Sequence, residues 1–279
     1  MKRTALSLSG LLLMGLLFTA CNDSANQQET EATAAPEIKL KEEDITYTDQ
    51  GDSLKGFIVY NENDTVRRPA VLVVPEWWGL TDYPKYRARE LAKLGYVAMA
   101  VDFYGNGRTA ETPADAKNLA EPWYGNPAGA KSRIEAAMAV VKGLPVTDTG
   151  KVAAIGYCFG GAMVLNVAKL GADLKSVVSF HGTLDGVPAN KDLLKASILV
   201  CHGGADKFLT PESIVNFKKQ MDSIGADYTF KEYPGALHAF SNPKATEKGK
   251  QFNIPIAYDP AADTASWNDM KAFLEKTLK

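Results

Sequence analysis

Short apolar segments of strand length alternate along this chain with segments of helical length, and this alternation restricts the fold more than any other feature. The expected strands cover residues 54–60, 70–74, 96–103, 152–157, 176–180, 197–201 and 228–233. Most are apolar without interruption, which is typical of parallel strands that are covered on both faces. The expected helices cover residues 83–94, 128–142, 160–170, 212–224 and 264–278. A β-α-β order of this kind predicts one doubly wound, mostly parallel sheet with helices on both faces.

The composition is that of one globular domain rather than of a disordered or fibrous chain. Of the 279 residues, 46% are hydrophobic and 23% are charged, and no repeat or internal linker divides the core. The formal net charge is −2 and no basic cluster stands out, so we expect no nucleic-acid partner. Three cysteines are too few for a disulfide scaffold, and no Cys-x-x-Cys pair indicates a zinc site. We expect neither a metal nor an organic cofactor.

The N-terminal segment has the pattern of an export signal. Lys2 and Arg3 precede an apolar run over residues 11–18, which is short for a bilayer span, and Cys21 follows in a sequence that resembles a bacterial lipobox. We expect a signal peptide over residues 1–20, lipidation of Cys21 and a flexible tether over residues 21–37. The alternative is an ordinary secretory signal cut nearby. The expected product is an exported, membrane-anchored lipoprotein, attached only through its lipid, whose folded domain covers residues 38–279.

The chain turns sharply around Cys158. The sequence Gly156-Tyr157-Cys158-Phe159-Gly160-Gly161 follows an expected strand and opens an expected helix. It is the G-x-S-x-G nucleophile pattern with Cys in place of Ser, in the strand–turn–helix context that the pattern requires. A helix N-terminus favours a thiolate, so Cys158 is the candidate nucleophile. The alternative is a structural cysteine on a glycine-rich turn.

Two residues further along the chain are candidates for the base and the acid that orients it. In this fold the order is nucleophile, acid, histidine. Asp206 follows the strand that ends near Cys201, and His238 lies in the loop after the last strand. His181 and His202 precede Asp206 and are expected to be strand-end residues bonded by backbone.

The remaining acids and cysteines are weaker candidates for a catalytic role. Asp173 and Asp185 are expected in surface loops, as alternatives to Asp206. Cys201 ends a strand that should be separated from the strand of Cys158 by residues 176–180, or roughly 9–10 Å, which is beyond disulfide reach. Both thiols are therefore expected to be free.

Residues 104–127 interrupt the alternation directly after a strand end, where ligands bind in open α/β sheets. Trp123 and Tyr124 suggest a flap over a substrate. The alternative is a solvent loop with one short helix.

Taken together, several of these motifs resemble the dienelactone hydrolase family. The elbow around Cys158, the stretch Glu76-Trp77-Trp78-Gly79-Leu80, Gly204-x-Asp206, Gly235-x-x-His238-x-Phe240 and the chain end after Tyr258 carry the resemblance, over about residues 38–279. It implies an α/β-hydrolase fold and a Cys-Asp-His triad of Cys158, Asp206 and His238. It also implies that Glu76 holds the resting thiol and helps to activate it. The implied oxyanion hole consists of the backbone amides of Trp77 and Phe159.

The sequence departs from the family where the founding enzymes bind a substrate carboxylate. The family has an arginine four residues after the catalytic histidine, and Asn242 takes that place here. A lid arginine has no clear counterpart, and Lys117 is the nearest cation. Without bidentate cationic contacts, an anionic dienelactone is a doubtful substrate.

The sequence therefore predicts a monomeric hydrolase that cleaves a small carboxylic ester or lactone, of the carboxymethylenebutenolidase type. Two alternatives keep catalysis but change the substrate: a general carboxylesterase or thioesterase on a neutral substrate, and a peptidase. A third alternative is a surface binding protein that uses the same scaffold without turnover.

Overall fold

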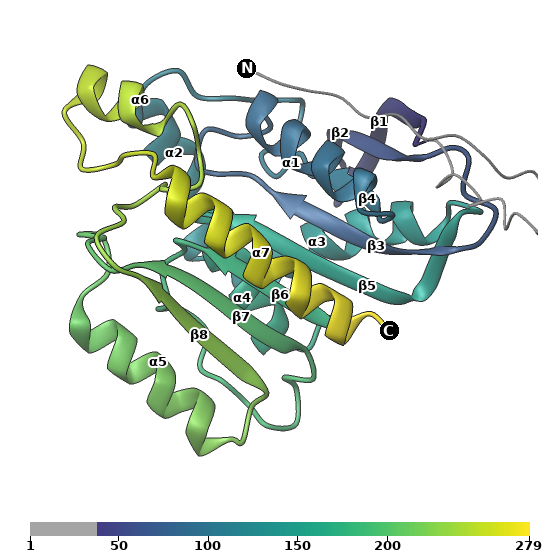
Figure 1. The fold of residues 1–279 in the computed structure, drawn as a ribbon. Helices are drawn as coiled ribbons and strands as arrows, with labels where there is room; N and C mark the ends of the chain where they lie inside the picture. Colours follow the sequence, from purple (N-terminus) through teal and green to yellow (C-terminus); the bar gives the residue numbers. More distant parts are fainter. Residues whose placement is uncertain (1–37) are drawn as a thin grey trace, which may run out of the picture. The chain divides into compact units, whose positions relative to one another are not determined.

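A computed structural model describes residues 38–279 of the chain (Figure 1). One sheet of eight strands organises the described domain. The strands are β1 (Leu40–Asp49), β2 (Asp52–Asn61), β3 (Arg68–Val74), β4 (Val97–Ala100), β5 (Thr147–Tyr157), β6 (Ser176–Phe180), β7 (Ser197–Gly203) and β8 (Tyr228–Tyr233). The order across the sheet is β1-β2-β4-β3-β5-β6-β7-β8. β3 to β8 are parallel, whereas β1 and β2 are antiparallel to their neighbours.

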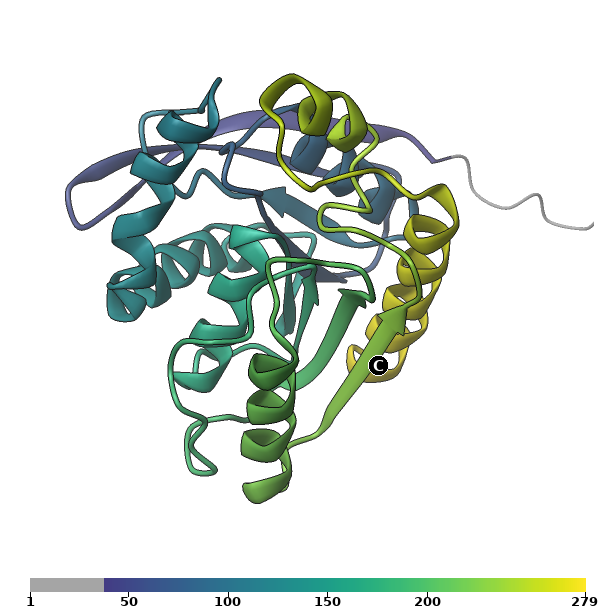
Figure 2. The ribbon, with the colours of Figure 1, turned by 90° about the vertical axis from the view of Figure 1, so that its left-hand side faces the viewer.

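Helices cover both faces of this sheet (Figures 1 and 2). They are α1 (Asp82–Lys93), α2 (Pro113–Tyr124), α3 (Pro127–Lys142), α4 (Phe159–Lys169), α5 (Pro211–Ser223), α6 (Ala245–Phe252) and α7 (Pro260–Thr277). One core layer joins α1 and α7 to the sheet, and the other joins α3, α4 and α5 to the opposite face. Successive residues of β3 alternate between the two layers: Leu72 packs in one and Val73 in the other. The uninterrupted apolar strands thus result from burial on both sides, and the predicted doubly wound, mostly parallel sheet is confirmed.

The structure adds three elements that the sequence analysis lacked. β1 is an edge strand with mostly exposed or half-buried side chains, so it has no apolar run to mark it. α6 is short and largely polar. Residues 104–127 contain α2, a regular helix of 12 residues that begins at the Thr112 cap, Thr112 Oγ1 accepting from the Asp115 amide. The alternative of a solvent loop with one short helix therefore underestimated the length of the helix in this segment.

The predicted signal peptide over residues 1–20, Cys21 and the tether over residues 21–37 lie outside the described residues. Within residues 38–279 no helix has the length and apolar character needed to cross a bilayer.

Candidate active site

Cys158 sits on a tight turn between β5 and α4. Its backbone has φ 53° and ψ −114°, a conformation that L-residues rarely adopt. The turn requires glycines on both sides. A Cβ on Gly156 would lie 2.1 Å from the carbonyl oxygen of Gly160, and a Cβ on Gly160 would lie 2.3 Å from that of Val74. The glycines flanking Cys158 in the sequence are therefore explained by close backbone packing, and the thiol is placed at the start of a helix.

Three of the predicted site residues lie in hydrogen-bond contact. His238 Nε2 is 3.1 Å from Cys158 Sγ, although the two residues are 80 positions apart. On the other side of the ring, His238 Nδ1 is 2.8 Å from Asp206 Oδ2. The second oxygen of Asp206 accepts from the backbone amide of Phe208 at 2.8 Å, which fixes the carboxylate. Asp206 follows β7 and His238 follows β8, so three strand ends supply the three groups.

The charges around His238 favour its protonated form. Burial by itself would lower the pKa of this imidazole, but the negative charges of Cys158 and Asp206, together with their hydrogen bonds, raise it to about 10. A base whose protonated form is favoured in this way can accept a proton from a nucleophile within hydrogen-bond distance. The site is thus electrostatically suited to a nucleophilic sulfur.

Glu76 follows β3. It is buried, and it lines the same cavity as Cys158 and His238. Its Oε2 accepts a hydrogen bond of 2.6 Å from Asn242 Nδ2. Within the described residues no hydrogen bond joins Glu76 to Cys158, whose sulfur contacts His238 instead. Burial raises the pKa of Glu76 to about 7, although the Asn242 bond and the nearby positive groups partly oppose this. Asn242, which the sequence analysis treated only as a missing cation, is therefore the hydrogen-bond partner of a carboxyl group that titrates near neutrality.

Glu76→Gln is expected to stabilise the protein at alkaline pH. The ordinary pKa of 4.5 rises to about 7 in the fold, so the unfolded chain ionises first as the pH increases. The stabilisation that comes from the raised pKa of Glu76 is complete below about pH 4.5, and it is lost as the pH rises through 7. Gln has no proton to lose and still accepts from Asn242. Urea denaturation at pH 5 and pH 8.5 should show a gain that grows with pH, towards about 3 kcal/mol.

Glu42→Gln is the matched control for this experiment. Glu42 lies in β1, where its hydrogen bonds to Arg89 lower its pKa, so removing its charge should give no alkaline gain. Equal stability differences between wild type and Glu76→Gln at both pH values would contradict the expectation.

A cavity of about 260 Å³ opens at Cys158. Cys158 and His238 lie in its lining, and its wall is largely aromatic and aliphatic, with contributions from Trp77, Trp78, Tyr124, Phe208, Ile254 and Ile256. Tyr124 and Phe208 are nearly half exposed at its edge. Among the lining residues Lys117 is the only lysine or arginine. α2 thus contributes Lys117 and Tyr124 to the lining, and of these Tyr124 is one of the two aromatic residues on which the flap interpretation rested. Trp123 instead packs inward against Phe103, with ring centroids 4.9 Å apart.

The backbone amides expected to form an oxyanion hole belong to Trp77, after β3, and to Phe159, at the start of α4. Phe159 begins α4, where a first-turn amide has no acceptor within the helix. Trp77 follows Glu76, and its carbonyl oxygen accepts from Tyr104 at 3.0 Å, which holds this loop. The two segments are joined by a 3.0 Å hydrogen bond from the Gly160 amide to the Pro75 carbonyl.

The other candidate residues are not part of the hydrogen-bond contact among Cys158, His238 and Asp206. Asp173 is exposed and pairs with Lys142 at the surface. Cys201 is a buried free thiol in β7, and burial raises its pKa to about 12. Cys158 is also free, and β6 separates β5 from β7 as predicted. Within residues 38–279 no group of three or more His, Cys, Asp or Glu side chains is placed to hold a metal ion.

The chain is similar to known proteins in both sequence and structure. The model of the dienelactone hydrolase family matches residues 54–278. Protein usf of Aquifex pyrophilus is 30% identical over 216 residues, which cover 75% of this chain and 89% of the relative. An Aquifex aeolicus protein with the provisional name carboxymethylenebutenolidase is 30% identical over 217 residues, covering 76% and 89%.

Among solved structures, a dienelactone hydrolase-like promiscuous phosphotriesterase from metagenomic libraries superimposes with a TM-score of 0.80. It is 32% identical, and the match covers 86% of this chain and 99% of that protein. The family match extends from β2 to the last residues of α7 and includes Glu76, Cys158, Asp206 and His238. The chain belongs to the dienelactone hydrolase family.

Proposed function

We propose that this protein hydrolyses carboxylic esters or lactones through a Cys158–His238–Asp206 triad. The observation that carries the proposal is the position of His238, which is 3.1 Å from the Cys158 sulfur and 2.8 Å from an Asp206 oxygen. A nucleophile bonded to a base that is itself held by a third group is the arrangement used for acyl transfer. Membership of a hydrolase family supports the same reaction class.

In the first half of the reaction the Cys158 thiolate attacks the carbonyl carbon of the ester. A carbon–sulfur bond forms, the carbonyl electron pair moves to oxygen, and the Phe159 and Trp77 amides stabilise that oxyanion. The intermediate collapses by breaking the bond to the leaving oxygen, which takes a proton from the His238 imidazolium. A thioester on Cys158 and an alcohol result. For a lactone, the alcohol remains part of the same molecule.

In the second half, neutral His238 accepts a proton from water as the water oxygen attacks the thioester. The carbon–sulfur bond breaks, the carboxylic acid leaves, and the thiolate and imidazolium return. For Glu76 we propose the thiol-activating role that the family resemblance implies. Glu76 and Cys158 line the same cavity, which supports this role, and a pKa of about 7 lets the Glu76 carboxyl hold or release a proton at neutral pH.

The proposed substrates are neutral and apolar. The cavity is lined mainly by aromatic and aliphatic side chains, and Asn242 is occupied by Glu76 rather than free to bind an anion. Lys117 on α2 offers a single point charge rather than a bidentate contact. The solved relative named as a promiscuous phosphotriesterase is consistent with this proposal, because phosphotriesters carry no charge.

A panel of p-nitrophenyl acetate, p-nitrophenyl butyrate, a neutral γ-lactone and a carboxylated dienelactone tests the substrate class. The expected result is a higher kcat/KM for the neutral esters than for the dienelactone, since a carboxylate would enter an apolar cavity without a paired cation. Strong selectivity for the carboxylated lactone would contradict it. Lack of turnover on every compound, with the protein folded, would favour the binding-protein alternative.

We also propose that the domain is exported and tethered by lipid on Cys21. The charged start, the apolar run over residues 11–18 and the lipobox-like sequence support this.

A further inference from the structure

His181 directly follows β6 and contacts the turn that carries Cys158. Its Nδ1 is 3.1 Å from the backbone amide of Cys158, which also bonds the Phe180 carbonyl at 2.9 Å. Its Nε2 is 2.8 Å from Ser241 Oγ. The side chain is buried, and His181 is not among the residues that line the cavity. His181 therefore bridges two loops, one with the nucleophile and one with the base, without facing the substrate space.

These contacts fix the proton on the His181 ring. A backbone amide can only donate, so Nδ1 must accept and the single ring proton must be on Nε2, which then donates to Ser241. The environment agrees, because burial and the nearby positive charges of His238 and Arg87 hold the pKa of His181 well below its ordinary value. His181 is thus a neutral imidazole with both nitrogens in use, whereas the pKa of its neighbour His238 is raised to about 10 by Cys158 and Asp206.

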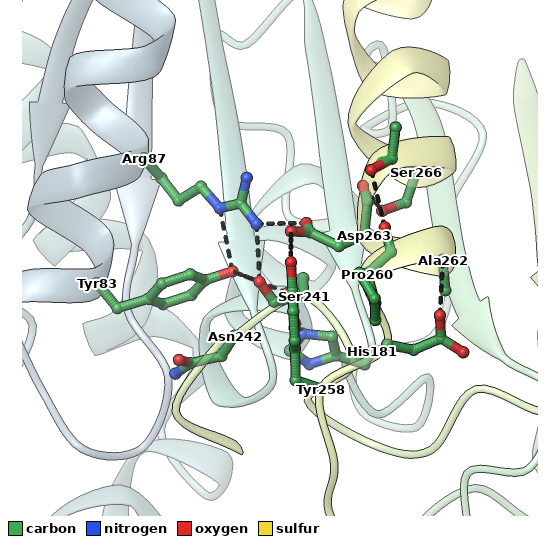
Figure 3. A network of polar contacts seen from close by, with 12 residues as sticks. Tyr83, Arg87, His181, Ser241, Asn242, Tyr258, Pro260, Ala262, Asp263 and Ser266 are labelled. Carbon is green, nitrogen blue, oxygen red and sulfur yellow. Dashed lines mark hydrogen bonds and ion pairs between the residues drawn. The ribbon is translucent and has the colours of Figure 1, made fainter. Parts of the chain in front are cut away.

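The Ser241 end of this bridge is anchored in a polar network (Figure 3). Ser241 Oγ is 2.8 Å from the Tyr83 hydroxyl, which accepts from Arg87 Nε at 3.2 Å. Arg87 also donates to the Ser241 carbonyl at 2.7 Å and forms a buried ion pair with Asp263 of α7. Helices α1 and α7 therefore hold Ser241, and through it the loop that carries His238. The Ser241 end of the bridge is therefore held by several polar contacts, and the turn that carries Cys158 is positioned relative to it.

We propose that His181 is a positioning residue that sets the spacing between the Cys158 sulfur and the His238 imidazole. The inference rests on the proposed function, since it matters only if those two groups exchange a proton. The ring of His181 also packs against that of His238, with centroids 5.2 Å apart and an interplanar angle of 63°. One side chain thus contacts both partners of the proposed proton transfer, through a hydrogen bond to the backbone of one and through ring packing against the other.

His181→Phe and His181→Asn test this role. Phe keeps a ring but removes both hydrogen bonds, whereas the Asn carboxamide oxygen can occupy the place of Nδ1 and accept from the Cys158 amide. Displacement of reacting groups by about 1 Å costs around 100-fold in rate, so we expect His181→Phe to lower kcat on p-nitrophenyl acetate by about 10- to 100-fold. KM should change little, because His181 does not line the cavity. His181→Asn should recover most of the lost kcat.

The pH profile of iodoacetamide alkylation at Cys158 separates positioning from simple destabilisation. A weakened contact between Cys158 and His238 should change the profile in His181→Phe, whereas His181→Asn should remain close to wild type. Ser176→Ala is the matched control. It removes a buried hydroxyl at the other end of β6, bonded to Thr277, and should lower Tm without altering kcat or the alkylation profile.

A His181→Phe enzyme with wild-type kcat, or with a reduced kcat but an unshifted alkylation profile, would overturn the positioning role. Cys158→Ala distinguishes this failure from failure of the proposed function. If Cys158→Ala still turns over ester, the proposed function itself fails. If it is inactive while His181→Phe behaves as wild type, only the positioning role fails.

Discussion

Cys158→Ala is expected to reduce p-nitrophenyl acetate hydrolysis by about 10⁴-fold or more, leaving only the residual rate that substrate binding and the oxyanion amides support. Without the sulfur no thioester forms, and His238 has no proton to accept from a nucleophile. The cavity wall, the amides of Trp77 and Phe159 and the Asp206–His238 bond remain in place, so the loss measures covalent catalysis rather than a collapsed site. Steady-state kinetics and peptide mapping after iodoacetamide treatment provide the two measurements.

Cys201→Ala is the matched control, because Cys201 is the other thiol of the described domain. Cys201 is buried in β7, where it accepts from the Tyr233 hydroxyl at 3.5 Å, and burial raises its pKa to about 12. The variant should keep wild-type turnover, and alkylation in the wild type should fall on Cys158 alone. Turnover that survives in Cys158→Ala but disappears in Cys201→Ala would reverse the assignment of the nucleophile.

Asp206→Asn is expected to lower kcat by about 10³- to 10⁴-fold through the proton position on His238. One oxygen of Asp206 accepts from the Phe208 amide, so the oxygen of Asn would be held there and its NH₂ group would face His238 Nδ1. Nδ1 would then have to accept, which places the ring proton on Nε2 towards Cys158. The imidazole could no longer take a proton from the thiol, and an imidazolium would lose its anionic partner.

Asp173→Asn serves as the control for this substitution. Asp173 is an exposed acid paired with Lys142, and its loss should leave kcat unchanged. The pH dependence of kcat/KM should also change in Asp206→Asn, since the carboxylate contributes to the raised pKa of His238. A kcat within a few-fold of wild type would remove Asp206 from the proposed triad.

The residues of the site differ in how far sequence alone could reveal them. Cys158, Asp206 and His238 each follow a parallel strand that the sequence predicts, and parallel strands bring such ends to one edge of a sheet, so their meeting could be expected. The pairing of Glu76 with Asn242 could not, since it depends on where two buried side chains point. His181 was expected to be bonded by backbone. Its Nδ1 does accept from the Cys158 amide, but its second bond to Ser241 joins loops that no local pattern connects.

The same limit applies to the fold. Burial on both faces gives β3, β6 and β7 a continuous apolar signature, and those strands were found within two residues of their observed bounds. β5 begins five residues before its expected start, in a polar stretch without an apolar run. β1 pairs with β2 along its full length in a hairpin, but its mostly exposed or half-buried side chains give it no apolar run. α6 is only eight residues long and largely polar, although its Phe252 stacks on Trp78.

The separation of the two free thiols by β6 has a consequence for how the purified chain must be handled. A bond between Cys158 and Cys201 would join the ends of β5 and β7 and leave β6 no place between them. An oxidised chain is therefore excluded from the native arrangement, and renaturation from urea in air should yield inactive material. Dithiothreitol present from the start of refolding should restore the yield.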